Sequence, residues 1–98
     1  MREVIISYEV WDRMDELFFY LVSELKLSEE AAFRKTAKMR AFIRSLSSPV
    51  NHAKCRFKLW RNLGYRCAIF EKSWIFAYED LGDEVIVRDM KHTAILKE

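Results

Sequence analysis

Two helices are predicted from the spacing of apolar positions in the first half of the chain. From residue 10 to residue 25, apolar side chains recur three and four positions apart, which predicts an amphipathic helix of roughly four turns. The same spacing continues from residue 32 to Leu46, with Ser28 as the expected N-cap and Pro49 beyond the end. Because only residues 26 and 27 link the two patterns, we expect an antiparallel helical hairpin.

Shorter apolar runs predict β-strands at both ends of the chain. The segment EVIISY near the start is β-branched and predicts a first strand over residues 3–8. In the C-terminal third, strands and tight turns alternate as an antiparallel meander, in which Gly82 can take a positive φ. The predicted order there is strand 65–71, turn 72–73, strand 74–79, turn 80–83 and strand 84–91.

Alternation within these strands predicts which side chains face the helices. We expect four apolar residues on the helix-facing side: Cys67, Ile69, Val85 and Val87. Three polar residues then share the open side: Arg66, Arg88 and His92. The parity of the middle strand stays open, because its aromatic residues and its aliphatic residues occupy alternate positions.

The segment before the meander, residues 54–60 (KCRFKLW), also alternates with period two. Its apolar members are Cys55, Phe57 and Leu59, and its basic members are Lys54, Arg56 and Lys58. This pattern predicts a half-buried extended segment with a cationic open face.

Together these elements predict an α+β fold in one domain over residues 1–98. The N-terminal strand precedes an antiparallel helical hairpin, which packs on a three- to four-stranded, mainly antiparallel sheet. No apolar run reaches the length of a membrane span, and the first ten residues lack a signal-peptide pattern, so we expect a cytoplasmic protein. Cys55 and Cys67 fit neither a disulfide framework nor a zinc spacing, which predicts reduced thiols.

Charge is distributed unevenly, although the net charge is only +2. Residues 31–70 contain ten Lys or Arg and no Asp or Glu, so all fifteen acidic residues lie outside this stretch. Such a basic segment is typical of a protein that meets a polyanion or an acidic partner, and it is equally compatible with a solvated cationic helix face.

The sequence offers few candidates for chemistry. It contains no nucleophile elbow, phosphate loop or paired Cys/His metal motif, and we expect neither a metal site nor a cofactor. Cleavage of a phosphodiester by its 2′-hydroxyl needs a base, an acid and positive charge on the phosphate. His92 could transfer the protons while Arg66 and Arg88 stabilise the charge. The alternative is structural: His92 ends a strand and Arg88 forms an ion pair with Glu79 or Asp89.

Nearly the whole chain resembles the RelE/ParE superfamily of type II toxin–antitoxin toxins. The start EVIISYEVWDRMDELFFYL is similar to the family's first strand and helix, and the helix ending in IRSLSSP is similar to its second. The segment RNLGYRCAIFEKSWIFAYE, followed by DEVIVRDMKH, is similar to the family's strand, hairpin and final strand ending near a histidine.

The resemblance implies a small bacterial toxin that is neutralised by a cognate antitoxin protein. RelE-like members cleave mRNA on the ribosome without metal, whereas ParE-like members poison DNA gyrase. Carried onto this chain, the resemblance implies catalytic roles for Arg66, Arg88 and His92. It also matches Lys72 to a basic residue that is common at the hairpin, and we expect RNA binding by Lys72 together with the basic residues of the preceding segment: Lys54, Arg56, Lys58 and Arg61.

Three positions depart from the nuclease pattern of the family. Ile69 and Trp74 stand where many members have arginine, and Thr93 stands where some nucleases have tyrosine. Three functions therefore remain open: a ribosome-dependent mRNA interferase, a gyrase-binding toxin without nuclease activity, and a degenerate member that only binds an antitoxin. The basic segment 54–61 could hold RNA in the first case or an acidic antitoxin segment in the others.

Overall fold

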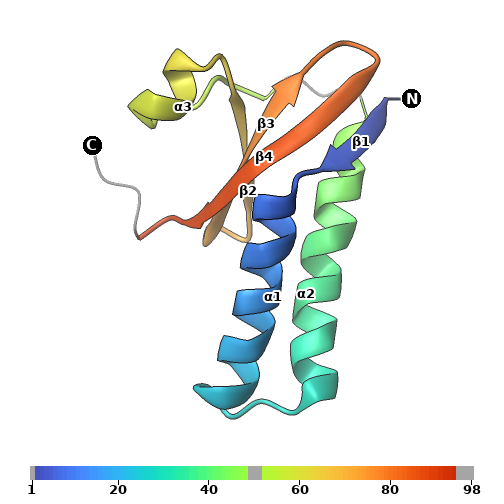
Figure 1. Ribbon diagram of the computed structural model, residues 1–98, viewed down its shortest axis with the longest axis vertical. Coiled ribbons are helices and arrows are strands. Elements are labelled where there is room, and N and C mark those ends of the chain that lie inside the picture. The colour runs from blue at the N-terminus through green and yellow to red at the C-terminus, as the bar shows by residue number, and fades with distance from the viewer. Residues whose placement is uncertain (1, 49–51, 95–98) are drawn as a thin grey trace.

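The computed structural model describes residues 2–48 and 52–94 and has the predicted α+β architecture (Figure 1). Two long helices lie side by side against one face of a four-stranded sheet. No helix in the described ranges is long and apolar enough to cross a membrane. The elements are β1 (Glu3–Ile6), α1 (Tyr8–Ser23), α2 (Glu29–Arg44), η1 (Ser45–Ser47), α3 (Lys58–Asn62), β2 (Arg66–Phe70), β3 (Trp74–Asp80) and β4 (Glu84–His92).

The sheet has the strand order β1-β4-β3-β2, so the first and last strands of the chain are neighbours. β1 runs parallel to β4, while β2, β3 and β4 form the predicted antiparallel meander. The first turn of the meander is built from Glu71 and Lys72, both at positive φ, and the second contains Gly82 at φ 90°. Two consecutive residues at positive φ match the right-handed twist of the strands that a tight hairpin joins.

The helical hairpin forms as its sequence predicts. The Ser28 hydroxyl caps α2 by accepting a hydrogen bond of 3.1 Å from the Ala31 N–H. Lys26 takes φ 58°, and the Leu27 N–H donates to the Leu21 carbonyl at 3.0 Å, which closes the C-terminus of α1. All five positions of the predicted apolar stripe are buried: Ala32, Thr36, Met39, Ile43 and Leu46.

The main core lies between this hairpin and the sheet. It contains Phe76 and Tyr78 of β3, so the aromatic residues of the middle strand face the helices and the open parity is resolved. Val85 and Val87 face the helices as predicted. Cys67 and Ile69 do not: Ala68 of the same strand occupies the core, Cys67 belongs to a second cluster and Ile69 is 59% exposed. The alternation of β2 was therefore assigned to the wrong face.

Residues 52–65, which we call the cap, cover part of the other face of the sheet. Cys55 and Trp60 of the cap are buried with Ala77 of β3, and Phe57 packs against them. Part of the cap is the short helix α3, so the prediction of an extended segment over residues 54–60 is wrong from residue 58 onward. The single bridge Lys54–Arg66 is its only described strand-like pairing. The alternating pattern arose because Cys55 and Phe57 point into the second cluster before the chain turns into α3.

The two cysteines form a disulfide bond, contrary to the predicted reduced thiols. Cys55 of the cap and Cys67 of β2 are joined across a sequence separation of 12, with Cα atoms 4.9 Å apart. The pairing depends on the antiparallel contact between residue 54 and residue 66, which brings the flanking positions together. Cysteine spacing alone does not encode such a contact.

Candidate functional site

The three predicted catalytic residues are not brought together. Arg66 lies opposite Tyr78 of β3, whereas His92 lies opposite Trp74 of the same strand. Four residues of extended chain separate those two positions, which corresponds to about 14 Å along the strand. The prediction that Arg66, Arg88 and His92 share one open side is wrong, because Tyr78 and Trp74 both face the helices and a register shift in β4 displaces Arg88.

Arg88 is held by an acidic neighbour. Its guanidinium donates two hydrogen bonds to Glu79 Oε1, from Nε at 3.1 Å and from Nη2 at 2.8 Å. The hydrogen bond with Glu79 raises the pKa of Arg88. This is the ion pair that the structural alternative predicted, and it neutralises the charge that Arg88 would offer to a phosphate.

His92 ends β4 in a different environment. Its ring lies edge-on to Trp74, with centroids 5.2 Å apart, and its Nδ1 accepts a hydrogen bond of 3.1 Å from the Ala94 N–H. The ring borders a groove of about 730 Å³ between α1 and the end of β4, together with Tyr20 and Lys91. His92 therefore lies in a groove lined by aromatic side chains, at the end of the sheet away from Arg66.

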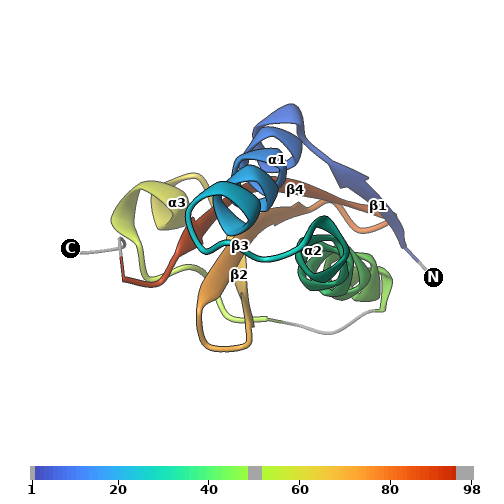
Figure 2. The same cartoon turned by 90° about the horizontal axis from the view of Figure 1, so that it is seen from below.

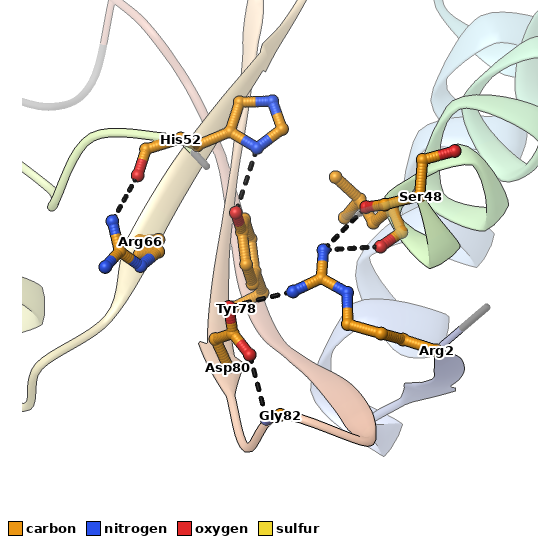
Figure 3. Close-up of polar contacts among 8 residues, drawn as sticks. Arg2, Ser48, His52, Arg66, Tyr78, Asp80 and Gly82 are labelled. Atoms are coloured by element: carbon orange, nitrogen blue, oxygen red, sulfur yellow. Dashed lines mark hydrogen bonds and ion pairs between the residues drawn. The ribbon is translucent and has the colours of Figure 1, made fainter. Parts of the chain in front are cut away.

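Arg66 instead meets a histidine that sequence reasoning left aside. Its Nη1 donates to the backbone carbonyl of His52, and His52 Nδ1 lies 2.9 Å from the hydroxyl of Tyr78 (Figure 3). The Tyr78 ring is fully buried in the main core, so its hydroxyl is a fixed point at the end of the sheet. His52, Arg66 and Tyr78 thus form a compact polar cluster, which we call the His52 cluster.

The ion pair between Arg2 and Asp80 lies next to this cluster (Figure 3). Arg2 donates from Nη1 to Asp80 at 2.8 Å and from Nη2 to the carbonyls of Leu46 and Ser48 at 2.9 and 2.8 Å. The Gly82 N–H donates to Asp80 Oδ1 at 2.9 Å, and this hydrogen bond, aided by Arg2, lowers the pKa of Asp80. Figure 3 shows Arg2, the residue before β1, reaching toward Asp80 on the side of Tyr78 away from Arg66.

Burial and charge tune the two titratable groups of the cluster in different directions. Desolvation, together with the nearby charges of Arg2 and Arg66, lowers the pKa of His52. Desolvation raises the pKa of Tyr78. The lowered pKa favours the neutral imidazole of His52, a form that can accept a proton. No sequence motif signals this cluster, because the cap alone brings His52 to Arg66.

The cations of the basic stretch are divided between two sides of the molecule. Five lie on α2. The four predicted RNA-binding residues of the cap lie elsewhere and are all exposed: Lys54, Arg56, Lys58 and Arg61. Figures 1 and 2 both place α2 and α3 on opposite sides of the molecule. Lys72 is exposed in the β2–β3 turn, at the end of β2 opposite Arg66. Lys54 is the predicted RNA-binding residue that pairs with Arg66, so the cap is continuous with the His52 cluster.

Two further features bear on ligand binding. A hollow of about 430 Å³ on the cap side is lined by basic and apolar residues, among them Arg56, Phe57 and Cys67. Within residues 2–48 and 52–94, no group of three or more His, Cys, Asp or Glu side chains is placed to hold a metal ion.

Comparison with known proteins identifies a structural relative. No protein-family model matches the sequence, and no curated protein matches it either. Among solved structures, the chain matches one from the chromosomal ParDE toxin–antitoxin system of P. aeruginosa with a TM-score of 0.76. The match covers 94% of this chain and 96% of the other at 11% sequence identity. The chain therefore has the RelE/ParE-like fold that its order of elements predicted.

Proposed function

We propose that this protein is the toxin of a type II toxin–antitoxin system and acts in the cytoplasm, where a cognate antitoxin neutralises it. The fold shared with the ParDE chain over nearly the whole length of both supports this proposal. A short neighbouring gene whose product binds this chain and restores growth would be the partner that the proposal requires.

For the mechanism, we propose ribosome-dependent cleavage of mRNA at the His52 cluster. The observation that carries the proposal is the imidazole of His52, which has a lowered pKa, on a residue whose backbone carbonyl accepts a hydrogen bond from Arg66, next to the exposed cations of the cap. In the tautomer that donates from Nδ1 to the Tyr78 hydroxyl, Nε2 of His52 is the basic nitrogen.

The proposed reaction is transfer of the phosphodiester to the adjacent 2′-hydroxyl. His52 Nε2 takes the proton from the 2′-hydroxyl, which attacks the phosphorus, and the 5′-oxygen leaves with a proton returned to it. The products are a 2′,3′-cyclic phosphate and a 5′-hydroxyl. In this proposal Arg66 and Lys54, which are neighbours across a strand-like bridge, stabilise the charge that develops on the phosphate oxygens.

Matched histidine variants test this mechanism. The wild-type protein is expressed from an inducible promoter in bacteria, and mRNA ends are mapped during growth arrest. We expect codon-phased cleavage that His52→Ala abolishes and that His92→Ala leaves intact, since His92 lies at the other end of the sheet. Arrest without new mRNA ends, or cleavage unchanged in His52→Ala, would contradict the proposal.

A second candidate is a ParE-like toxin that binds DNA gyrase without cleaving RNA. The pairing of Arg88 with Glu79 and the distance between Arg66 and His92 favour it, because both weaken a nuclease site of the expected kind. It predicts DNA damage and filamentation while translation continues at first. Normal growth on expression, together with tight antitoxin binding, would instead indicate a member that retains only antitoxin binding.

A further inference from the structure

The cap is attached to the sheet by one covalent bond and few backbone hydrogen bonds. The Cys67 N–H of β2 donates to the Ala53 carbonyl at 3.2 Å, and within the cap the Cys55 N–H donates to the Tyr65 carbonyl at 3.0 Å. Between these two hydrogen bonds the Cys55–Cys67 disulfide joins the cap to β2. The disulfide closes a loop that contains α3 and ends at the first residues of β2.

The side chains that hold the cap are mostly apolar. Trp60 is 3% exposed and packs on Ala77, with Phe57 at its edge, ring centroids 5.3 Å apart. The Lys91 ammonium lies 5.2 Å from the ring centre of Phe57 and 5.8 Å from that of Trp60. Among the described residues, no ion pair joins an acid to the four cap cations, which are Lys54, Arg56, Lys58 and Arg61.

The two cysteines differ in how far they are exposed to solvent. Cys55 is 1% exposed, whereas Cys67 is only partly buried and lines the hollow of about 430 Å³ on the cap side. A small thiol can enter this hollow and reach Cys67 while Cys55 stays covered. Exchange therefore has an accessible first sulfur and a second sulfur held close to it by the flanking hydrogen bonds.

We propose that the Cys55–Cys67 pair is a reversible redox switch that sets how firmly the cap is held on the sheet. In oxidation, the Cys67 thiolate attacks a small-molecule disulfide, forms a mixed disulfide and releases one thiolate. The Cys55 thiolate then attacks Cys67 Sγ, forms the internal disulfide and releases the second thiolate. Two protein thiols lose two protons and two electrons, and the small-molecule disulfide becomes two thiols. A small-molecule thiol reverses both steps.

Reduction loosens the cap without unfolding the domain. The main core contains no residue of the cap, so the packing of the helices on the sheet does not depend on the disulfide. The cap then keeps the hydrogen bond from the Cys67 N–H to Ala53, the contacts of His52 with Arg66 and Tyr78, and the packing of Trp60 and Phe57. Such a unit opens locally more often than the domain opens globally.

Trypsin tests the switch directly, because all four cap cations are potential cleavage sites. We compare the wild-type protein oxidised and after reduction by dithiothreitol, with native conditions confirmed by circular dichroism. We expect cleavage within the cap to become at least about tenfold faster on reduction. Cuts after Arg56, Lys58 or Arg61 fall inside the disulfide loop, so in the oxidised protein the fragments separate only on a reducing gel.

A double variant and an internal control complete the test. Cys55→Ser combined with Cys67→Ser removes the switch, and its cap should be cut at the fast rate in both redox conditions. Cleavage at Lys35 and Lys38 of α2, far from the cap, should not change with redox state. Equal cleavage rates for the oxidised and reduced wild type would overturn the proposal. Reduction that occurs only together with loss of the helical signal would overturn it as well.

The consequence for nucleic acid rests on the proposed function and is measured separately. If the cap cations grip RNA, binding of a short single-stranded RNA should weaken several-fold on reduction, because loosened cations no longer match the phosphates. A redox-dependent change in proteolysis without any RNA binding would support the switch and contradict its proposed role in RNA binding. RNA binding together with redox-independent proteolysis would overturn the switch and leave the proposed RNA binding by the cap intact.

Discussion

The two faces of the sheet are covered in different ways. On one face, α1 and α2 bury a continuous apolar core that includes Phe76, Tyr78 and Val87. On the other, the cap places Cys55 and Trp60 over a small cluster and is fixed by a disulfide. The helical face gains its stability from burial and periodic packing, whereas the cap face relies on a covalent link and a few aromatic contacts.

This difference separates stability from candidate function. The helical face is covered by apolar packing. The Tyr78 hydroxyl lies at the end of this face and is the polar group of the main core that takes part in the candidate site. The cap carries four exposed cations and delivers His52 to Arg66, so the candidate site depends on the less firmly held part of the fold. Segments with few packing contacts are where binding residues are commonly found.

The largest effect is expected in the main core. Phe76 is fully buried beneath the helices, and Phe76→Ala should lower the free energy of unfolding by about 3–5 kcal/mol. Ile69→Ala on the other side of the sheet is the matched control, since its side chain is 59% exposed and should cost less than about 1 kcal/mol. Urea unfolding followed by circular dichroism measures both, and equal losses would contradict the contrast between the faces.

Removing the disulfide should have the next largest effect. A closed loop of this size is worth about 3 kcal/mol in the chain-entropy account, so Cys55→Ser with Cys67→Ser should lower the free energy of unfolding by about that amount. Hydrogen exchange should report the loss mainly at amides of the cap, with those of α2 retaining more protection. A uniform loss over both faces would show that the cap is not a separate unit.

The sequence predicts the helical face far better than the cap face, for physical reasons. The stripe from Ala32 to Leu46 is periodic because one continuous helix packs on one surface, and a period can be read locally. The cap has no such regularity: Cys55 and Trp60 are buried, while Leu59 between them is 58% exposed. Its shape depends on the tertiary bridge of Lys54 to Arg66, which no local pattern records.

The candidate site was predicted in part for the same reason. The sequence indicates Arg66 as a candidate site residue, and it predicts that the histidine beside Arg66 is His92 at the end of the last strand. The register places His92 against Trp74, and the cap brings the loop residue His52 to Arg66 instead. A loop histidine has no periodic signal, and a tyrosine such as Tyr78 is more often a core residue than a hydrogen-bond partner for a site.

Arg2 should contribute more to stability than a surface ion pair, since it closes the end of the helical face. Its guanidinium binds Asp80 and the carbonyls of Leu46 and Ser48, so Arg2→Met should cost about 1–3 kcal/mol by leaving these groups unpaired. The control is Arg13→Met, whose pairing with Asp89 is more exposed and should be worth less than about 1 kcal/mol. Thermal unfolding of both variants tests the order.

The smallest effect is a change in the pH dependence of stability, and it is specific to the His52 cluster. The folded state lowers the pKa of His52, so below the unfolded value of 6.5 the unfolded chain binds more protons at this residue. This contribution to stability is complete above that value and is lost as the pH falls through it, until the pKa of folded His52 is passed. His52→Gln should flatten the pH dependence of the unfolding free energy between about pH 7.5 and about pH 5.5, relative to the wild type.

His92→Gln removes the imidazole at the other end of the sheet and is the matched control. If both variants flatten the profile equally, or neither does, the environment of His52 is not the source of the pH dependence. A flatter profile in His52→Gln alone would tie the titration to Arg2 and Arg66, the cations that border this end of the sheet.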